Sequence, residues 1–419
     1  MKQLLESILK DWWNKPTPSL VPRSLDLMEF TNLPFRKAIC ITGFRRVGKT
    51  YLLFDLANKL GVQNCAYINF EDERLPRETQ LLSALLEILT QMKGSQPLTL
   101  LLDEIQDVPR WSLWARRVLD STPHQLFITG SSSKISSSQL PTEMRGRSLS
   151  VHVSPLNFDE FTRFNNHDPL TQSTPQNLFM ANQYLMYGGF PEVVLADTGK
   201  KTLLLDEYFQ TFMLRDLVER HRIRHGHQLR MFIRLLVNSP YFTVSKLTNV
   251  IKSQGADISK PTLIRYLDFL KQSYFFTPAL LHTPSLKNRF KAAQKPYFVD
   301  TGIVSRLSTQ FSQNTGLLME QAVFAKLSNN NREIYYWQDY AKHEVDFVVR
   351  DRETVIRLVQ VCYVSDGEHL PEREAKSLMK AARILKCRNL HIITWDLEKS
   401  LEIGQETISL IPFWKFLLT

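Results

Sequence analysis

Short apolar runs alternate with segments of helical spacing along the first part of the chain. Runs of strand character stand at 37–42, 64–70, 98–103 and 125–131. Between them, segments such as 51–60 and 80–92 repeat apolar residues every three or four positions, as amphipathic helices do. This alternation of strands and helices predicts an α/β fold in which helices cover both faces of a doubly wound parallel sheet.

The pattern becomes mostly helical after this sheet. The segment 156–225 is interrupted at Gly188-Gly-Phe-Pro-Glu192, and we interpret it as a helical lid. Three helical patterns and two apolar runs follow, at 228–238, 243–253, 260–272, 274–281 and 295–300. Three helices and a hairpin predict a winged helix-turn-helix with 260–272 as its recognition helix. A second α/β pattern fills the rest of the chain. The predicted domains are therefore 1–155, 156–225, 226–300 and 301–419.

Residues 43–50 contain the most specific motif of the chain. They read Gly-Phe-Arg-Arg-Val-Gly-Lys-Thr and fit the phosphate-loop pattern G-x-x-x-x-G-K-[ST] between a strand and a helix. Loop N–H groups and a helix N-terminus would hold the phosphates of ATP, and Lys49 would reach the β and γ phosphates. We expect nucleotide contacts from the whole loop and the residue after it: Gly43, Phe44, Arg45, Arg46, Val47, Gly48, Lys49, Thr50 and Tyr51.

A second motif supports the first. The apolar run 98–102 ends in Asp103 and Glu104, so a buried parallel strand would deliver two carboxylates to its C-terminal edge. We expect Thr50 and Asp103 to hold Mg²⁺, and Glu104 to orient the attacking water. The alternative is that this Asp-Glu pair only begins a helix.

The next strand and the turn after it supply further catalytic candidates. Polar residues end the run 125–133, and Ser131 is our first candidate for sensing the γ-phosphate, with Thr129 second. Arg145 and Arg147 precede another strand, at 148–153, and are candidates for an arginine finger. Because such a finger usually acts on a neighbouring subunit, this interpretation predicts a homo-oligomer. A surface pair or an internal salt bridge is the alternative for both arginines.

Composition narrows the setting of the protein. Of the 419 residues, 43% are hydrophobic and 22% charged, which is ordinary for a globular protein. No stretch reaches the ~18 uninterrupted apolar residues of a membrane span, and the N-terminal 13 residues have the pattern of an amphipathic helix and not of a signal peptide. The four cysteines are scattered, which argues against a disulfide framework or a zinc site. We therefore expect a cytoplasmic protein without a membrane partner.

Positive charge is concentrated in one segment. Between Arg220 and Asp300 there are fourteen Lys and Arg but three Asp, a formal charge of +11, whereas the rest of the chain sums to −1. This concentration predicts a polyanionic partner, and DNA fits the expected winged helix. The candidate contacts are Lys260, Thr262, Arg265, Lys287, Arg289 and Lys291. Winged helices also dock proteins, so a protein partner stays open.

The C-terminal α/β pattern resembles the core of restriction-endonuclease-like, PD-(D/E)xK, nucleases. In that fold, a helix Glu, a strand Asp and an Asp/Glu-x-Lys on the next strand bind a metal ion and activate water. Glu320 and Asp346 match the first two positions, but Gln360 and Cys362 stand where Glu and Lys are expected. A neutral Gln is a poor ligand for a hard cation. The resemblance therefore implies a degenerate nuclease-like domain with little or no cleavage.

Taken together, the motifs resemble one family, the AAA-superfamily ATPases of archaea and bacteria that end in a DUF4143 domain. The stretches that carry the resemblance are 43–50, 98–106, 129–131, 146–147, 188–192, 297–302 and 344–347. The family implies ATP binding and a winged helix between lid and nuclease-like domain. Our hypothesis is a Mg²⁺-ATP-binding and hydrolysing ATPase that switches or drives a DNA-engaging winged-helix module. The alternative is a nucleotide-gated regulator or scaffold whose basic module docks a protein.

Overall fold

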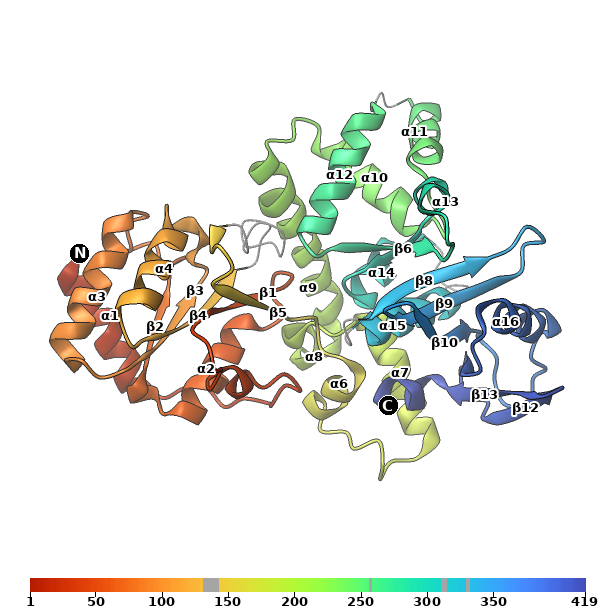
Figure 1. Ribbon diagram of the computed structural model, residues 1–419, viewed down its shortest axis with the longest axis horizontal. Helices are drawn as coiled ribbons and strands as arrows, with labels where there is room; N and C mark the ends of the chain where they lie inside the picture. The colour runs from red at the N-terminus through yellow and green to blue at the C-terminus, as the bar shows by residue number, and fades with distance from the viewer. Residues whose placement is uncertain (131–142, 256–257, 310–314, 329–331) are drawn as a thin grey trace. The chain divides into compact units, whose positions relative to one another are not determined.

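The computed structural model describes residues 1–130, 143–255, 258–309, 315–328 and 332–419. It divides into two compact units, Met1–Ser154 and Pro155–Thr419 (Figure 1). No helix within the described residues is both long and apolar enough to cross a membrane. All four cysteines lie in these residues as free thiols.

The first unit is built on a five-stranded parallel sheet. Its strands are β1 (Ala38–Thr42), β2 (Cys65–Asn69), β3 (Thr99–Asp103), β4 (Gln125–Gly130) and β5 (Ser148–His152). Their order across the sheet is β2-β3-β4-β1-β5, and all neighbouring pairs are parallel. The doubly wound prediction is confirmed. Strand β4 lies between β3 and β1, so it is next to the strand that feeds the phosphate loop.

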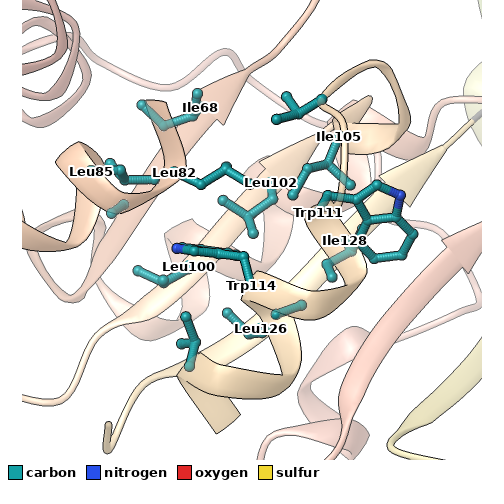
Figure 2. Packing of buried hydrophobic residues seen from close by; sticks show 14 of the residues in the cluster. Ile68, Leu82, Leu85, Leu100, Leu102, Ile105, Trp111, Trp114, Leu126 and Ile128 are labelled. Carbon is teal, nitrogen blue, oxygen red and sulfur yellow. The ribbon is translucent and has the colours of Figure 1, made fainter. Parts of the chain in front are cut away.

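Helices cover this sheet because their apolar positions form one stripe each. The helical elements are α1 (Lys2–Asn14), η1 (Leu27–Phe30), α2 (Lys49–Leu60), η2 (Val62–Asn64), α3 (Thr79–Lys93), η3 (Ile105–Asp107) and α4 (Trp111–Ser121). On α4, the residues Trp111, Trp114, Ala115, Val118 and Leu119 are buried, which is the i, i+3, i+4, i+7, i+8 spacing of an amphipathic helix. Figure 2 shows Trp114 over the strand residues Leu100 and Leu126. Each such large buried side chain stabilises the fold by about 1.5–3 kcal/mol.

The second unit begins with helices. They are α6 (Phe158–Phe164), α7 (Thr174–Tyr187), α8 (Pro191–Leu195), α9 (Thr198–Thr211), which runs on as the π-helical segment η5 (Phe212–Glu219), and α10 (Gly226–Val237), α11 (Val244–Ser253) and α12 (Lys260–Gln272). The side chains of Thr243 and Ser259 cap α11 and α12 through the backbone N–H groups of Lys246 and Thr262. The three helices expected from the spacing at 228–272 are therefore present.

A mixed sheet organises the remainder of this unit. Its strands are β6 (Phe276–Leu281), β7 (Lys295–Phe298), β8 (Glu333–Gln338), β9 (Glu344–Asp351), β10 (Thr354–Val361), β11 (Leu390–Thr394), β12 (Lys399–Ile403) and β13 (Glu406–Pro412). The order is β12-β13-β11-β10-β9-β8-β6-β7. Because β6 pairs with β7 on one side and with β8 on the other, the segments 226–300 and 301–419 share one continuous sheet.

Five more helices of the described residues complete the second unit. They are α13 (Leu286–Lys291), α14 (Thr301–Leu307), α15 (Thr315–Ser328) and α16 (Glu372–Leu385), and α17 (Phe413–Leu418) ends the chain. Helix α13 lies within the connection between β6 and β7, where the sequence pattern predicts a plain hairpin; the Ser285 side chain, which caps it at Asn288, supports this extra turn. Helix α17 packs against α6 and α7, so residues 156–187 form part of the second unit.

Two of the sequence motifs meet in the interior of this unit. The buried carboxylate of Asp300 accepts hydrogen bonds from the backbone N–H groups of Gly189 (2.7 Å), Gly302 (2.9 Å) and Ile303 (3.3 Å). Burial raises the pKa of Asp300 to about 6, although these N–H donors oppose the rise. The Gly-Gly-Phe-Pro-Glu break at 188–192 and the Tyr-Phe-Val-Asp-Thr-Gly run at 297–302 therefore form one structural connection.

Gly188 tests this connection directly. It has φ +71°, and an added Cβ would lie 1.9 Å from Asp300 Oδ1. Gly188→Ala should lower the free energy of unfolding by about 2–5 kcal/mol, because it combines backbone strain with an overlap. Gly199, which is exposed on α9 and has open space around the position of a Cβ, supplies the matched control. Gly199→Ala should stay within about 1 kcal/mol of wild type. Equal urea denaturation curves for the two variants would contradict this account.

Candidate nucleotide-binding site

The phosphate loop lies between β1 and α2, as the motif predicts. Gly43 has φ +150°, and a Cβ there would lie 2.2 Å from the carbonyl oxygen of Val153. The loop therefore passes so close to the end of β5 that only glycine fits. Phe44 and Val47 are buried and anchor the loop, and Gly48 begins α2. The N-terminus of α2 is thus available as an anion site.

Lys49 is buried at the start of α2. Its ammonium donates hydrogen bonds to the carbonyl oxygens of Gly43 (3.2 Å) and Phe44 (2.9 Å), so it bends back over its own loop. Neutral carbonyl oxygens are weaker partners for an ammonium than phosphate oxygens. These two carbonyl oxygens stabilise the buried ammonium, and the oxygens of a bound anion would replace them as its partners.

Asp103 is the centre of the site. Its Oδ2 accepts hydrogen bonds from the hydroxyls of Thr50 (2.7 Å) and Tyr67 (2.9 Å), and its Oδ1 accepts one from Thr129. Asp103 is 2% exposed. Burial raises its pKa, while the hydrogen bonds from Thr129 and Thr50 act in the opposite direction. Three hydroxyls from α2, β2 and β4 therefore converge on one carboxylate at the carboxyl edge of the sheet.

The chemistry of this pair fits Mg²⁺. Thr50 supplies a hydroxyl oxygen and Asp103 a carboxylate oxygen, and the two atoms are already in contact. Oxygen ligands are those that Mg²⁺ takes in proteins, usually one or two protein groups together with phosphates and waters. The two residues named from the sequence as metal ligands thus lie side by side.

Glu104 follows Asp103 in the left-handed backbone region, with φ +55°. Its backbone N–H donates to Thr129 Oγ1 (3.0 Å), and Gln106 Nε2 donates to its Oε2 (2.5 Å). A non-glycine residue in this conformation is strained and persists only where neighbours enforce it. Thr129 and Gln106 are those neighbours: Thr129 holds the Glu104 backbone, and Gln106 contacts its carboxylate.

The other predicted residues of the first unit fall in different places. Tyr51 is 58% exposed on α2, Arg46 is exposed, and Arg45 lies 3.9 Å from Glu71. Ser131 lies outside the described residues. Arg145 and Arg147 are exposed, and Arg147 forms a salt bridge with Asp120 in its own chain, which is the alternative that the sequence left open for it. Both line a hollow of about 500 Å³.

The six candidate DNA contacts lie on α12 and α13 of the second unit. Lys260, Arg265, Lys287 and Lys291 are exposed, and Thr262 is half-buried at the start of α12. Arg289 differs from them. It donates to the carbonyl oxygen of Thr283 (3.0 Å) and lies over the ring of Tyr335, so much of its hydrogen-bonding capacity is used within the unit.

Two residues of the site carry no motif. Tyr67 reaches Asp103 from β2, and Arg23 donates to the carbonyl oxygens of Val47 (2.9 Å) and Ser154 (3.0 Å), which fixes the loop from behind. Since β2 pairs with β3 in register, with Tyr67 beside Leu101, the position of Tyr67 follows from the strand order. Nothing in the local sequence around Arg23 signals its role.

A parallel sheet of this strand order, a phosphate loop after β1 and a carboxylate at the end of β3, which β4 separates from β1, define a P-loop nucleotide-binding fold. The comparisons agree with this class. The model of an AAA domain, AAA_14, matches residues 35–162. Two domains of unknown function, DUF8612 and DUF4143, match residues 179–314 and 315–416.

The chain is 36% identical to the uncharacterized protein MJ1544 of Methanocaldococcus jannaschii, over 90% of this chain and 88% of the relative. It therefore belongs to the same family as that protein. This chain has an AAA_14 domain followed by a C-terminal DUF4143 domain. An uncharacterized protein of Haemophilus influenzae is 29% identical over 80% of this chain and 84% of its own length. Among solved structures, the Walker-type ATPase PABY2304 of Pyrococcus abyssi matches with a TM-score of 0.46 and 16% identity, over 65% of this chain and 91% of its own.

The Thr129 hydroxyl can be removed without changing the shape of the side chain, and its loss should disturb the site strongly. Thr129→Val takes a donor from Asp103 and leaves the Glu104 N–H without its acceptor. We expect the free energy of unfolding to fall by about 1–3 kcal/mol, the cost of buried polar groups left unpaired. Thr129→Ser keeps the hydroxyl and should recover most of the loss in urea denaturation. If Thr129→Ser unfolds as easily as Thr129→Val, altered packing, and not the loss of the hydrogen bonds, explains the effect.

Proposed function

We propose that this protein is a Mg²⁺-dependent ATPase whose hydrolysis cycle switches or drives a DNA-engaging module in its second unit. The observation that carries the proposal is that the hydroxyls of Thr50 and Thr129 both donate to Asp103 beside the phosphate loop, while Thr129 also accepts the backbone N–H of Glu104. Two magnesium ligands, a carboxylate that would accept a hydrogen bond from the water and a hydroxyl that links them lie at the start of α2, at the end of β3 and on β4. The AAA domain match over 35–162 supports ATP as the nucleotide.

Each residue has a defined task in this proposal. The loop N–H groups and the N-terminus of α2 bind the phosphates, and Lys49 exchanges the carbonyl oxygens of Gly43 and Phe44 for phosphate oxygens. When bound between Thr50 and Asp103, Mg²⁺ would neutralise charge on the β and γ phosphates. Glu104 accepts a hydrogen bond from the attacking water and polarises it. Gln106, which donates to Glu104, holds that carboxylate in position until water and nucleotide are present.

Three features support a DNA-engaging winged helix. The helices α10, α11 and α12 precede the antiparallel pair of β6 and β7, and Phe242, between α10 and α11, forms a bridge with Gln294 just before β7. The exposed Lys260 and Arg265 share α12, and the exposed Lys287 and Lys291 share α13. Exposed cations on these two helices would contact phosphates and give affinity without much sequence choice.

A protein partner is the second candidate. Leu286 and Phe290 are 62% and 69% exposed and lie four residues apart on α13. An exposed apolar pair of this kind favours a protein surface. Oligomerisation through Arg145 or Arg147 stays a further proposal, and sizing the protein with and without a non-hydrolysable ATP analogue would test it.

Glu104→Gln tests the hydrolytic mechanism. The amide keeps the shape but loses the charge that polarises water, so ATP turnover should fall by at least about 100-fold while ATP affinity stays close to wild type. Glu71→Gln makes the same chemical change at a neighbouring carboxylate that lies near Arg45, and it should leave turnover largely intact. Turnover of Glu104→Gln at the wild-type rate, measured as phosphate release, would remove Glu104 from the mechanism.

Lys287→Ala tests the DNA contact separately. Loss of one phosphate contact should reduce the slope of log K against log salt by about 0.9 for duplex DNA. Lys399 is an exposed lysine on β12, and Lys399→Ala should leave the slope unchanged. Equal slopes for both variants, or no DNA binding by the wild type at low salt, would favour the protein partner. In that case DNA should also fail to stimulate ATP turnover.

A further inference from the structure

A buried ion cluster lies in the second unit, and the proposed ATPase chemistry does not use it. The Lys295 cluster consists of Lys295, Glu320, Glu344 and Asp346. Lys295 Nζ lies 3.0 Å from Glu320 Oε1, 2.7 Å from Glu344 Oε1 and 2.6 Å from Asp346 Oδ1, and the lysine side chain is 5% exposed. An ammonium has three N–H donors, so three carboxylates use all of them.

The partners of Lys295 come from separate elements. Lys295 is the first residue of β7, Glu320 lies on α15, and Glu344 and Asp346 lie on β9. The carboxylates are bound further: Tyr297 donates its hydroxyl to Glu320 Oε1 (2.6 Å), and the Val361 N–H donates to Asp346 Oδ2 (2.9 Å). The position of every charged group in the cluster is thus fixed by at least one secondary-structure element.

Two residues of the cluster are the ones that the nuclease resemblance marks as metal ligands. Glu320 and Asp346 do lie close together, as that resemblance implies. Gln360, at the degenerate third position, accepts the backbone N–H of Asp346 through its Oε1 (3.1 Å), so its oxygen is turned to the backbone. Within the described residues, no group of three or more His, Cys, Asp or Glu side chains is placed to hold a metal ion. With the Lys295 ammonium between these carboxylates, the residues present do not fit a nuclease metal.

We propose that the Lys295 ammonium takes the place of a divalent metal ion among these carboxylates, so that the second unit binds no catalytic metal and its folding depends on this internal cation. The argument is geometric. A metal ion bound by Glu320, Glu344 and Asp346 would lie between their carboxylate oxygens. The Lys295 ammonium already occupies that position. This inference is independent of the proposed ATPase function.

The electrostatics agree with a permanently charged lysine. Burial alone lowers the pKa of Lys295, but Asp346 and Glu320 outweigh it and hold that pKa well above its ordinary value. Burial, together with Glu320 and Glu344, raises the pKa of Asp346 although Lys295 opposes the rise. Three carboxylates surround one ammonium, so the cluster has a net negative charge when the carboxylates are ionised. A cavity of about 250 Å³ that these residues line would repel a DNA phosphate.

Metal rescue of a lysine variant tests the proposal in the full chain, without nucleotide. Lys295→Met should lower Tm in EDTA by about 5 °C or more, because it leaves three carboxylates without their cation. Mn²⁺ or Ca²⁺ at millimolar concentration should then restore several degrees of Tm, and titration calorimetry should find Mn²⁺ binding that the wild type lacks. Repeating the titration with Asp103→Asn added excludes the site of the first unit.

Three comparisons keep the result decisive. Lys326→Met removes a half-buried lysine of α15 whose Nζ donates to the carbonyl oxygen of Leu417, and no metal should rescue it. If Lys295→Met does not fold, Lys295→Met/Glu344→Gln removes one repelling charge and should still take up Mn²⁺, whereas Lys295→Met/Asp346→Asn should not. Wild-type Mn²⁺ binding that Asp346→Asn abolishes would overturn the proposal. So would a lysine variant that folds, with or without Glu344→Gln, and gains no Mn²⁺ binding.

Discussion

The buried carboxylate of Asp103 is the constraint on which the first unit depends. Removing an ionised carboxylate from water is costly unless hydrogen bonds replace its hydration. The fold supplies these through Thr50, Tyr67 and Thr129, each on a different element of the Asp103 site. The same hydrogen bonds link the end of β3 to β2, to β4 and to the start of α2. Stability and chemistry are therefore coupled here: the groups that make the burial of Asp103 tolerable are the groups that would position nucleotide, metal and water.

A comparison of two buried lysines shows why one region suits a ligand and the other does not. Lys49 donates to two neutral carbonyl oxygens of its own loop, and phosphate oxygens make stronger, charge-assisted partners. Lys295 donates to three carboxylates, which an incoming anion would have to displace. The first lysine gains by binding an anion and the second loses. Burial alone therefore does not identify a binding lysine, since the charge of its partners decides.

The sequence predicted what lies in contiguous motifs and missed what depends on distant contacts. Residues 43–50 and 98–104 define a loop and a strand edge, so the pairing of Thr50 with Asp103 followed from their types and order. Tyr67 stands in an ordinary strand, and its role appears only when β2 pairs with β3 in register. Lys295 was counted in the formal charge of the basic segment, because composition cannot show that α15 and β9 bring three carboxylates to it. Helix α13 was missed for a related reason: six residues give too short a pattern to separate a helix from a turn.

The contacts of the second unit restrict how hydrolysis would act on its basic helices. Strand β6 pairs with both β7 and β8, Lys295 joins β7 to α15 and β9, and Asp300 joins the motif at 188–192 to α14. A hinge at residue 225 or 300 would break buried charge-assisted hydrogen bonds, whose separation leaves unpaired charges in the interior and is strongly unfavourable. Motion of the segment 226–300 against the C-terminal sheet is therefore the costly route. A nucleotide-driven change that keeps Pro155–Thr419 as one body breaks none of these contacts, so the basic helices would move together with the sheet that carries the Lys295 cluster.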